Sequence, residues 1–136
     1  MGRSRNLMPL FPKFPDYSGV IFPIQVEPID CSGEILTLIV VAIGQDGQVA
    51  HKTIINRRMV LSMFGVKGKY FLEVADLSLK SFLSHFEKTG TQVGWEPPLS
   101  NTKMGRVSQA MHDDIESMLQ TGVETFSAFA ASPNYL

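Results

Sequence analysis

The sequence predicts an α+β fold, in which an antiparallel meander of three or four strands carries two or three helices packed on one face. Three observations lead to this prediction. The first is an apolar run over Ile35–Ile43, rich in β-branched residues and interrupted only by Thr37. The second is a stretch of alternating apolar and polar residues just before that run. The third is a helical spacing of apolar residues after position 56.

The apolar run is predicted to be the central strand. As a helix it would rise about 14 Å, far less than the roughly 30 Å of a bilayer core. Gly33 and Gly44 bound it, and its β-branched residues favour a strand. Both sides of this strand are apolar and both need cover. With helices on one face, the other face is expected to be covered by the N-terminal segment or by another subunit.

The strands on either side follow from alternation and turn chemistry. Residues 20–29 alternate between apolar and polar side chains, as in a half-buried strand. Pro23 has no N–H to donate, so this strand is expected to lie at an edge or to carry a bulge. The Asp46-Gly47 pair is a strong hairpin signal and predicts a third strand over Val49–Ile55.

A short helix is predicted over Arg57–Phe64. Asn56 suits the N-cap position, and Gly65 suits the position after the last turn. The aromatic residues of Tyr70–Val74 favour a fourth strand, with the beginning of a helix as the alternative. A second helix is expected to begin at Asp76 or Ser78 and to end near Lys88, before Gly90.

The last part of the chain is predicted to be a long connection followed by a helix. The connection covers residues 90–101 and contains the only tryptophan, Trp95. The helix is expected from Asn101 or Thr102, with apolar residues four apart, and to continue past Gly122 with a bend or break there.

Composition indicates one domain of 136 residues, with an arm over residues 1–18 and the folded part over 19–136. Apolar residues make up 44% and charged residues 18%, below the roughly one quarter that is usual, which favours apolar surface covered by another chain. The formal net charge of −1 provides no general attraction to nucleic acid or membrane.

A cytoplasmic location is expected. The single cysteine, Cys31, cannot form an internal disulfide and fits a reducing compartment. The first residues carry two arginines and then a proline at position 9, without the apolar core of a signal peptide.

The N-terminal arm is the first candidate for function. Prolines at positions 9, 12 and 15 favour an extended path and separate large apolar side chains. Either the arm folds back over its own domain or it docks on a partner or a second copy. The candidate partner-binding residues are Leu10, Phe11, Phe14, Tyr17 and Trp95.

A basic cluster is the second candidate. It is either a solvated surface or a site for phosphate groups or nucleic acid, and it has few stacking aromatics beside it. Its members are Lys52, Arg57, Arg58, Lys67 and Lys69.

Signs of catalysis are weak. Cys31 lies in a predicted turn without a recognised signature around it. His112 and Glu116 are four apart, a spacing that lets two ligands share a metal on one helical face, but a metal site needs three or four ligands. A solvated polar surface is the competing interpretation, and we predict no cofactor, no metal and no catalytic residue.

The function that follows is a small non-enzymatic protein-interaction module, a subunit or adaptor of a larger assembly. Its partner is expected to be another protein or a second copy of the chain, and not a membrane. The alternative is a module that binds nucleic acid or a phosphate ligand through residues 52–69. A small hydrolase or metal enzyme around His112 and Glu116 ranks third.

Overall fold

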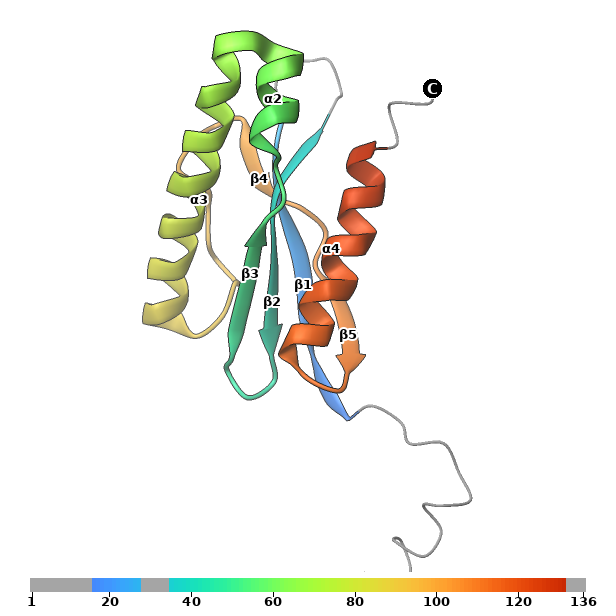
Figure 1. Ribbon diagram of the computed structural model, residues 1–136. Helices are drawn as coiled ribbons and strands as arrows, with labels where there is room; N and C mark the ends of the chain where they lie inside the picture. The colour runs from blue at the N-terminus through green and yellow to red at the C-terminus, as the bar shows by residue number, and fades with distance from the viewer. Residues whose placement is uncertain (1–15, 28–34, 132–136) are drawn as a thin grey trace, which may run out of the picture.

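The computed structural model describes residues 16–27 and 35–131. Its elements, in chain order, are β1 (Tyr17–Val26), β2 (Leu36–Gly44), β3 (Val49–Thr53), α2 (Arg57–Phe64), the 3₁₀ turn η2 (Gly65–Lys67), α3 (Gly68–Thr89), β4 (Thr102–Met104), β5 (Ser108–His112) and α4 (Ile115–Ala131). Figure 1 shows the sheet with its two long helices.

The described strands form one antiparallel sheet of five strands in the order β3-β2-β1-β4. β5 also pairs with β1, at the end of β1 away from β4. The α+β class and the β1–β2–β3 meander are therefore confirmed. The Asp46-Gly47 turn joins β2 to β3, and Gly47 has the positive φ of 89° that such a turn requires. The sheet is wider than predicted, because β4 and β5 extend it on the far side of β1.

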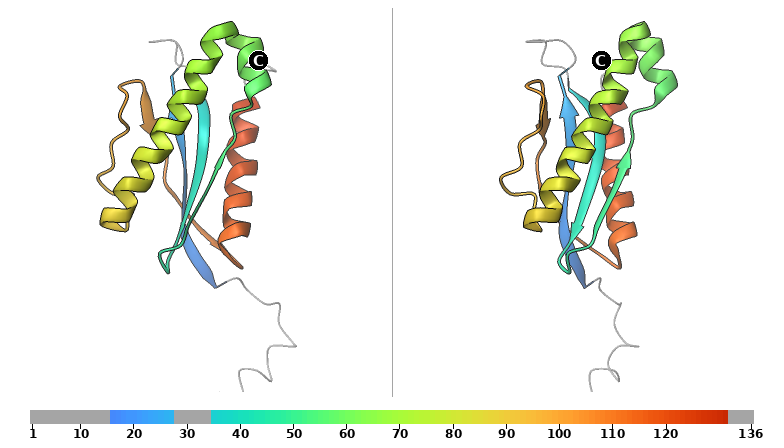
Figure 2. Two further views of the ribbon diagram at one scale, coloured as in Figure 1. Left: turned by 60° about the vertical axis from the view of Figure 1, so that its left-hand side comes forward. Right: turned by 90° about the vertical axis from the view of Figure 1, so that its left-hand side faces the viewer.

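The two long helices lie on opposite faces of the sheet, which corrects the prediction that the helices share one face (Figure 2). On the α3 face, Phe22 of β1 packs edge-on against Phe82 of α3 with ring centroids 5.5 Å apart. On the α4 face, Ile21 of β1 forms a smaller cluster with Met118 of α4. Helical periodicity shows that a helix has a buried side, but not which face of a sheet that side meets.

β2 is the central strand, as predicted, and its residues from Leu38 to Ile43 are buried. Val41 belongs to the cluster on the α3 face and Ala42 to the cluster on the α4 face. The second cover that this strand needs is therefore supplied by α4, where the sequence predicted the N-terminal segment or another subunit.

β1 is an interior strand, so the expectation that it lies at an edge is wrong. Pro23 is tolerated because it falls in the gap on one side of β1, where pairing with β5 ends at Ile21 and pairing with β4 begins at Ile24. In this gap the Pro23 carbonyl accepts a hydrogen bond of 2.8 Å from the Gly105 N–H. The alternative expectation, a bulge, agrees better with the structure, because the ladder with β2 shifts register one residue after Pro23, between Ile24 and Gln25.

Two local predictions are confirmed at the first helices. α2 has the predicted bounds, and Gly65 beyond it has a φ of 62°. α3 ends at Thr89, with Gly90 in the left-handed conformation and its N–H bonded to the Phe86 carbonyl. The strand predicted over Tyr70–Val74 is wrong, since these residues belong to α3.

The last helix begins later than predicted. β4 and β5 occupy residues that the sequence assigned to a helix, and α4 begins at Ile115. α4 then continues through Gly122. A Cβ on Gly122 would lie 2.8 Å from Val40 Cγ1, so this glycine lets the helix approach the sheet closely.

Candidate functional site

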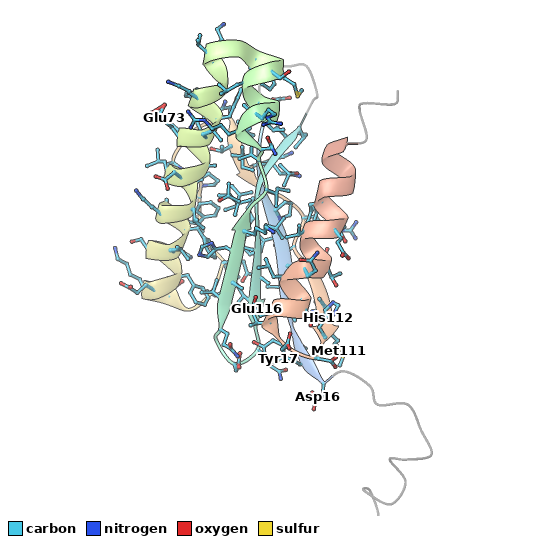
Figure 3. The ribbon with its side chains drawn as sticks, in the orientation of Figure 1. Asp16, Tyr17, Glu73, Met111, His112 and Glu116 are labelled. Atoms are coloured by element: carbon cyan, nitrogen blue, oxygen red, sulfur yellow. The ribbon has the colours of Figure 1, made fainter. Side chains whose placement is uncertain are left out.

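The outer side of η2 and α3 carries large apolar side chains that face solvent. Val66 is 86% exposed, Leu77 is 48% exposed, and Tyr70 is also exposed. Tyr70 comes three residues before Glu73 and Leu77 four residues after it, so these residues share a side of the helix. Figure 3 shows that Glu73 points away from the sheet. We call Val66, Tyr70 and Leu77 the α3 stripe.

Four exposed basic residues lie on the same segment of the chain, over α2, η2 and the start of α3. Arg57 and Arg58 begin α2, and Lys67 and Lys69 lie on either side of the junction between η2 and α3. All four are exposed, and none forms an ion pair with a described residue. α2, η2 and the first turn of α3 therefore carry positive charges that form no ion pair among the described residues, on the same segment as the exposed Val66 and Tyr70.

Lys52, the fifth member of the predicted basic cluster, lies elsewhere. It is exposed on β3 and pairs with Val40 of β2. Val40 contacts Gly122 of α4, which places Lys52 on the α4 face of the sheet. Four of the five predicted residues therefore lie on the consecutive elements α2, η2 and α3, whereas Lys52 lies on the sheet.

Tyr17, the one described member of the predicted arm residues, lies at the other end of the molecule. It belongs to β1, which begins inside the predicted arm. Its hydroxyl donates a hydrogen bond of 2.6 Å to Asp46 Oδ1 in the β2–β3 turn. Partial burial, and then this hydrogen bond and the charge of Asp46, raise the pKa of Tyr17 to about 12. Leu10, Phe11 and Phe14 lie outside the described residues.

Trp95 is a core residue of its own domain. It is only 6% exposed, its ring packs edge-on against Phe82 at 5.3 Å, and its indole N–H donates to Ser81 Oγ at 3.1 Å. A ring held in this way offers a partner little surface. Its assignment as a partner-binding residue therefore has no support from its position.

His112 and Glu116 do not share a helical face, because a strand ends and a helix begins between them. His112 is the last residue of β5, opposite Tyr17, and Glu116 lies in the first turn of α4 (Figure 3). Asp114 caps this helix by accepting a hydrogen bond of 2.8 Å from the Ser117 N–H. That bond is the main cause of the lowered pKa of Asp114, and nearby His112 adds to it.

No group of three or more metal-binding side chains occurs among the described residues. His51 is exposed on β3. The Nε2 atom of His85 lies 3.0 Å from the Val93 carbonyl oxygen. Cys31 lies outside the described part of the chain. The metal-enzyme interpretation around His112 and Glu116 thus lacks the further ligands that it needs.

The sequence interpretation missed the α3 stripe. The signal was present, since Val66, Tyr70 and Leu77 follow helical spacing. This helical spacing was not recognised because Tyr70 was assigned to a strand. In a strand every second residue points to the same face, so a spacing of four or seven has no special meaning. Only a helix that begins near residue 68 places Tyr70 and Leu77 on one side, with Val66 in the turn just before it.

No protein-family model, curated protein or solved structure matches this chain. Among the described residues, no helix combines the length and hydropathy that a bilayer crossing demands.

Proposed function

We propose that this chain is a non-enzymatic protein-interaction module, a subunit or adaptor of a larger assembly, and that it binds its partner through the α3 stripe. The observation that supports this is the exposure of Tyr70 and Leu77 on one side of α3, with Val66 exposed in the 3₁₀ turn that leads into this helix. Large apolar side chains are usually buried, and a group of them rimmed by polar residues is typical of a contact surface.

The partner that fits this surface is a protein segment with apolar side chains and acidic residues. Its apolar side chains would cover the α3 stripe, and its carboxylates would face the four basic residues of α2, η2 and α3. Those basic residues have no acidic partner among the described residues, so binding would not first have to break an ion pair.

A photo-crosslinking amino acid at position 66 tests this proposal in cells that express the chain. We expect a discrete crosslinked product that is lost when Tyr70→Ala and Leu77→Ala are added. The same crosslinker at Glu124, exposed on α4, is the matched control. Equal products at positions 66 and 124, or a product at 66 that survives both alanine substitutions, would contradict the proposal.

The four unpaired basic residues also support the alternative, a module for nucleic acid or phosphate ligands. If four cations contacted duplex DNA, the logarithm of the binding constant would fall with the logarithm of salt concentration at a slope of about −3.6. Arg57→Gln with Arg58→Gln should then flatten the slope, whereas Lys88→Gln at the other end of α3 should not. A binding constant that does not change with salt eliminates this alternative.

A further inference from the structure

Among the described residues, nothing covers the N-terminal end of β1 on the face of the sheet that α3 covers farther along the strand. In Figure 2 this end of β1 extends beyond the end of α3. A hollow of about 530 Å³ lies there against the paired residues of β1 and β5. It is lined by Ser18, Gly19, Val20, Gln109, Ala110 and Met111. We call it the β1–β5 hollow.

The exposure pattern of β5 explains why the hollow is open. Ser108, Ala110 and His112 are half-buried, whereas Gln109 and Met111 between them are exposed. Successive strand residues point to opposite faces, and α4 covers only one of them. Met111 is therefore left 57% exposed on the uncovered face.

The lining of the hollow favours an uncharged, apolar occupant. None of its described lining residues is charged, and Val20 and Met111 are its large apolar members. The Met111 side chain is unbranched, with a polarizable sulfur, and adapts to aromatic neighbours better than a branched one.

A segment of suitable chemistry begins at the edge of the hollow. The described chain starts at Asp16, two residues before Ser18, and Figure 3 shows Asp16, Tyr17 and Met111 at the same end of the molecule. The preceding residues include Leu10, Phe11 and Phe14 and no acidic residue. Phe14 lies four positions before Ser18 in the chain, a reach of up to about 13 Å.

We propose that residues 10–14 of the same chain dock in the β1–β5 hollow, with Phe11 or Phe14 against Met111. A segment joined to its own site is present at a high effective concentration, so even a shallow site can hold it. Docking would cover Met111 and the phenylalanines together. It would also extend the cover of the α3 face to the end of β1.

This inference is independent of the proposed function. The α3 stripe and the β1–β5 hollow lie at opposite ends of the molecule, as the positions of Glu73 and Met111 in Figure 3 show. Experiments on residues 10–14 and Met111 therefore leave the α3 stripe unchanged, and either proposal can fail without the other.

Paired cysteines test the docking in the full chain with Cys31→Ser as background. Phe11→Cys or Phe14→Cys is combined with Met111→Cys, and disulfide formation is followed in dilute, mildly oxidising solution. We expect one of these pairs to close within the monomer at least about tenfold faster than Phe14→Cys with Val66→Cys, because a disulfide needs Cα atoms within about 7 Å. Closure no faster than this control, or disulfides mainly between molecules, would overturn the proposal.

A second measurement keeps both phenylalanines and Met111 in place. In methionine-methyl NMR spectra of the intact chain, the Met111 methyl resonance, assigned with Met111→Leu, should be displaced by the aromatic rings. It should return towards the position of a solvent-exposed methionine in Phe11→Ala with Phe14→Ala, and stay unchanged in Tyr70→Ala. A resonance that the double substitution does not move would overturn the docking.

Discussion

At the scale of single residues, Tyr17 and Asp46 join the beginning of β1 to the β2–β3 turn. Asp46 accepts hydrogen bonds of 2.6 Å at both carboxylate oxygens, from the Tyr17 hydroxyl and from the Gln48 side-chain amide. Donors stabilise the ionised carboxylate, so the pKa of Asp46 lies below its ordinary value of 3.8, with the Tyr17 bond as the largest cause.

We expect Tyr17→Phe to raise the pKa of Asp46 towards 3.8, because it removes the strongest donor and leaves Gln48 in place. A lowered carboxyl pKa stabilises the fold above pH 3.8, and this contribution is lost as the pH falls through the lower folded value. NMR titration of the Asp46 carboxyl group measures the shift, with Tyr70→Phe as the control. An unchanged Asp46 pKa in Tyr17→Phe would contradict the assignment.

Tyr17→Phe should also change how stability depends on pH in alkaline solution, where the contribution of Tyr17 is lost as the pH rises. Between pH 10 and about 12 the unfolded chain loses the Tyr17 proton and the folded chain keeps it, so the free energy of unfolding falls as the pH rises. Tyr17→Phe should remove this part of the alkaline loss of stability.

At the scale of elements, α4 is held to the sheet by a small number of well-buried side chains. Met118 is fully buried among Ile21, Ala42 and Ile115. The absence of a side chain at Gly122 brings the helix axis close to Val40. Since α4 is the only described helix on this face, its packing decides whether the apolar far side of β2 stays dry.

We expect Met118→Ala to lower the free energy of unfolding by about 2–5 kcal/mol, because it leaves a cavity beneath α4. Met63→Ala is the matched control, since this methionine is exposed in the last turn of α2 and its loss should cost within about 0.5 kcal/mol. Urea denaturation of both variants measures the difference. Similar values for the two would show that α4 is not packed as described.

At the scale of the whole molecule, the described chain is a sheet between two helical layers. β1 and β2 have strand neighbours on both sides and helices over both faces, whereas β3, β4 and β5 each pair with one strand among the described residues. The interior pair is therefore expected to have the largest share of buried backbone hydrogen bonds, and the three outer strands the smallest.

Hydrogen exchange should follow this arrangement. We expect the amides of Leu38–Ile43 to exchange slowest, at the rate of global unfolding, and those of Val49–Thr53 to exchange faster because one edge of β3 is open. Exchange measured by mass spectrometry or NMR tests this expectation. Equal protection of β2 and β3 would indicate that the β3 edge is covered in solution, for example by a second copy.

Much of the first half of the fold could be predicted because its signals are local. The Asp46-Gly47 turn, the apolar run of β2 and the Asn56 and Gly65 boundaries of α2 depend on backbone conformation and side-chain type within a few residues. The basic residues could also be found by inspection. Their division into a group on α2, η2 and α3 and an isolated Lys52 could not.

The second half depended on contacts between distant residues. Val107, Met111 and Ile115 are four apart, as in a helix, yet Ser108–His112 is a strand because β1 offers it an open edge. Tyr70–Val74 has the aromatic content of a strand, yet Phe71 and Val74 pack inward from a long helix.

By itself, the sequence determined that the chain forms an antiparallel meander around a strand that needs cover on both sides. Only the tertiary structure decided that α4 provides the second cover, that Trp95 belongs to the core, and that Val66, Tyr70 and Leu77 face solvent. The physical reason is that alternation and helical spacing show which side of an element is apolar. They do not show which neighbour that side meets, because burial depends on the whole fold.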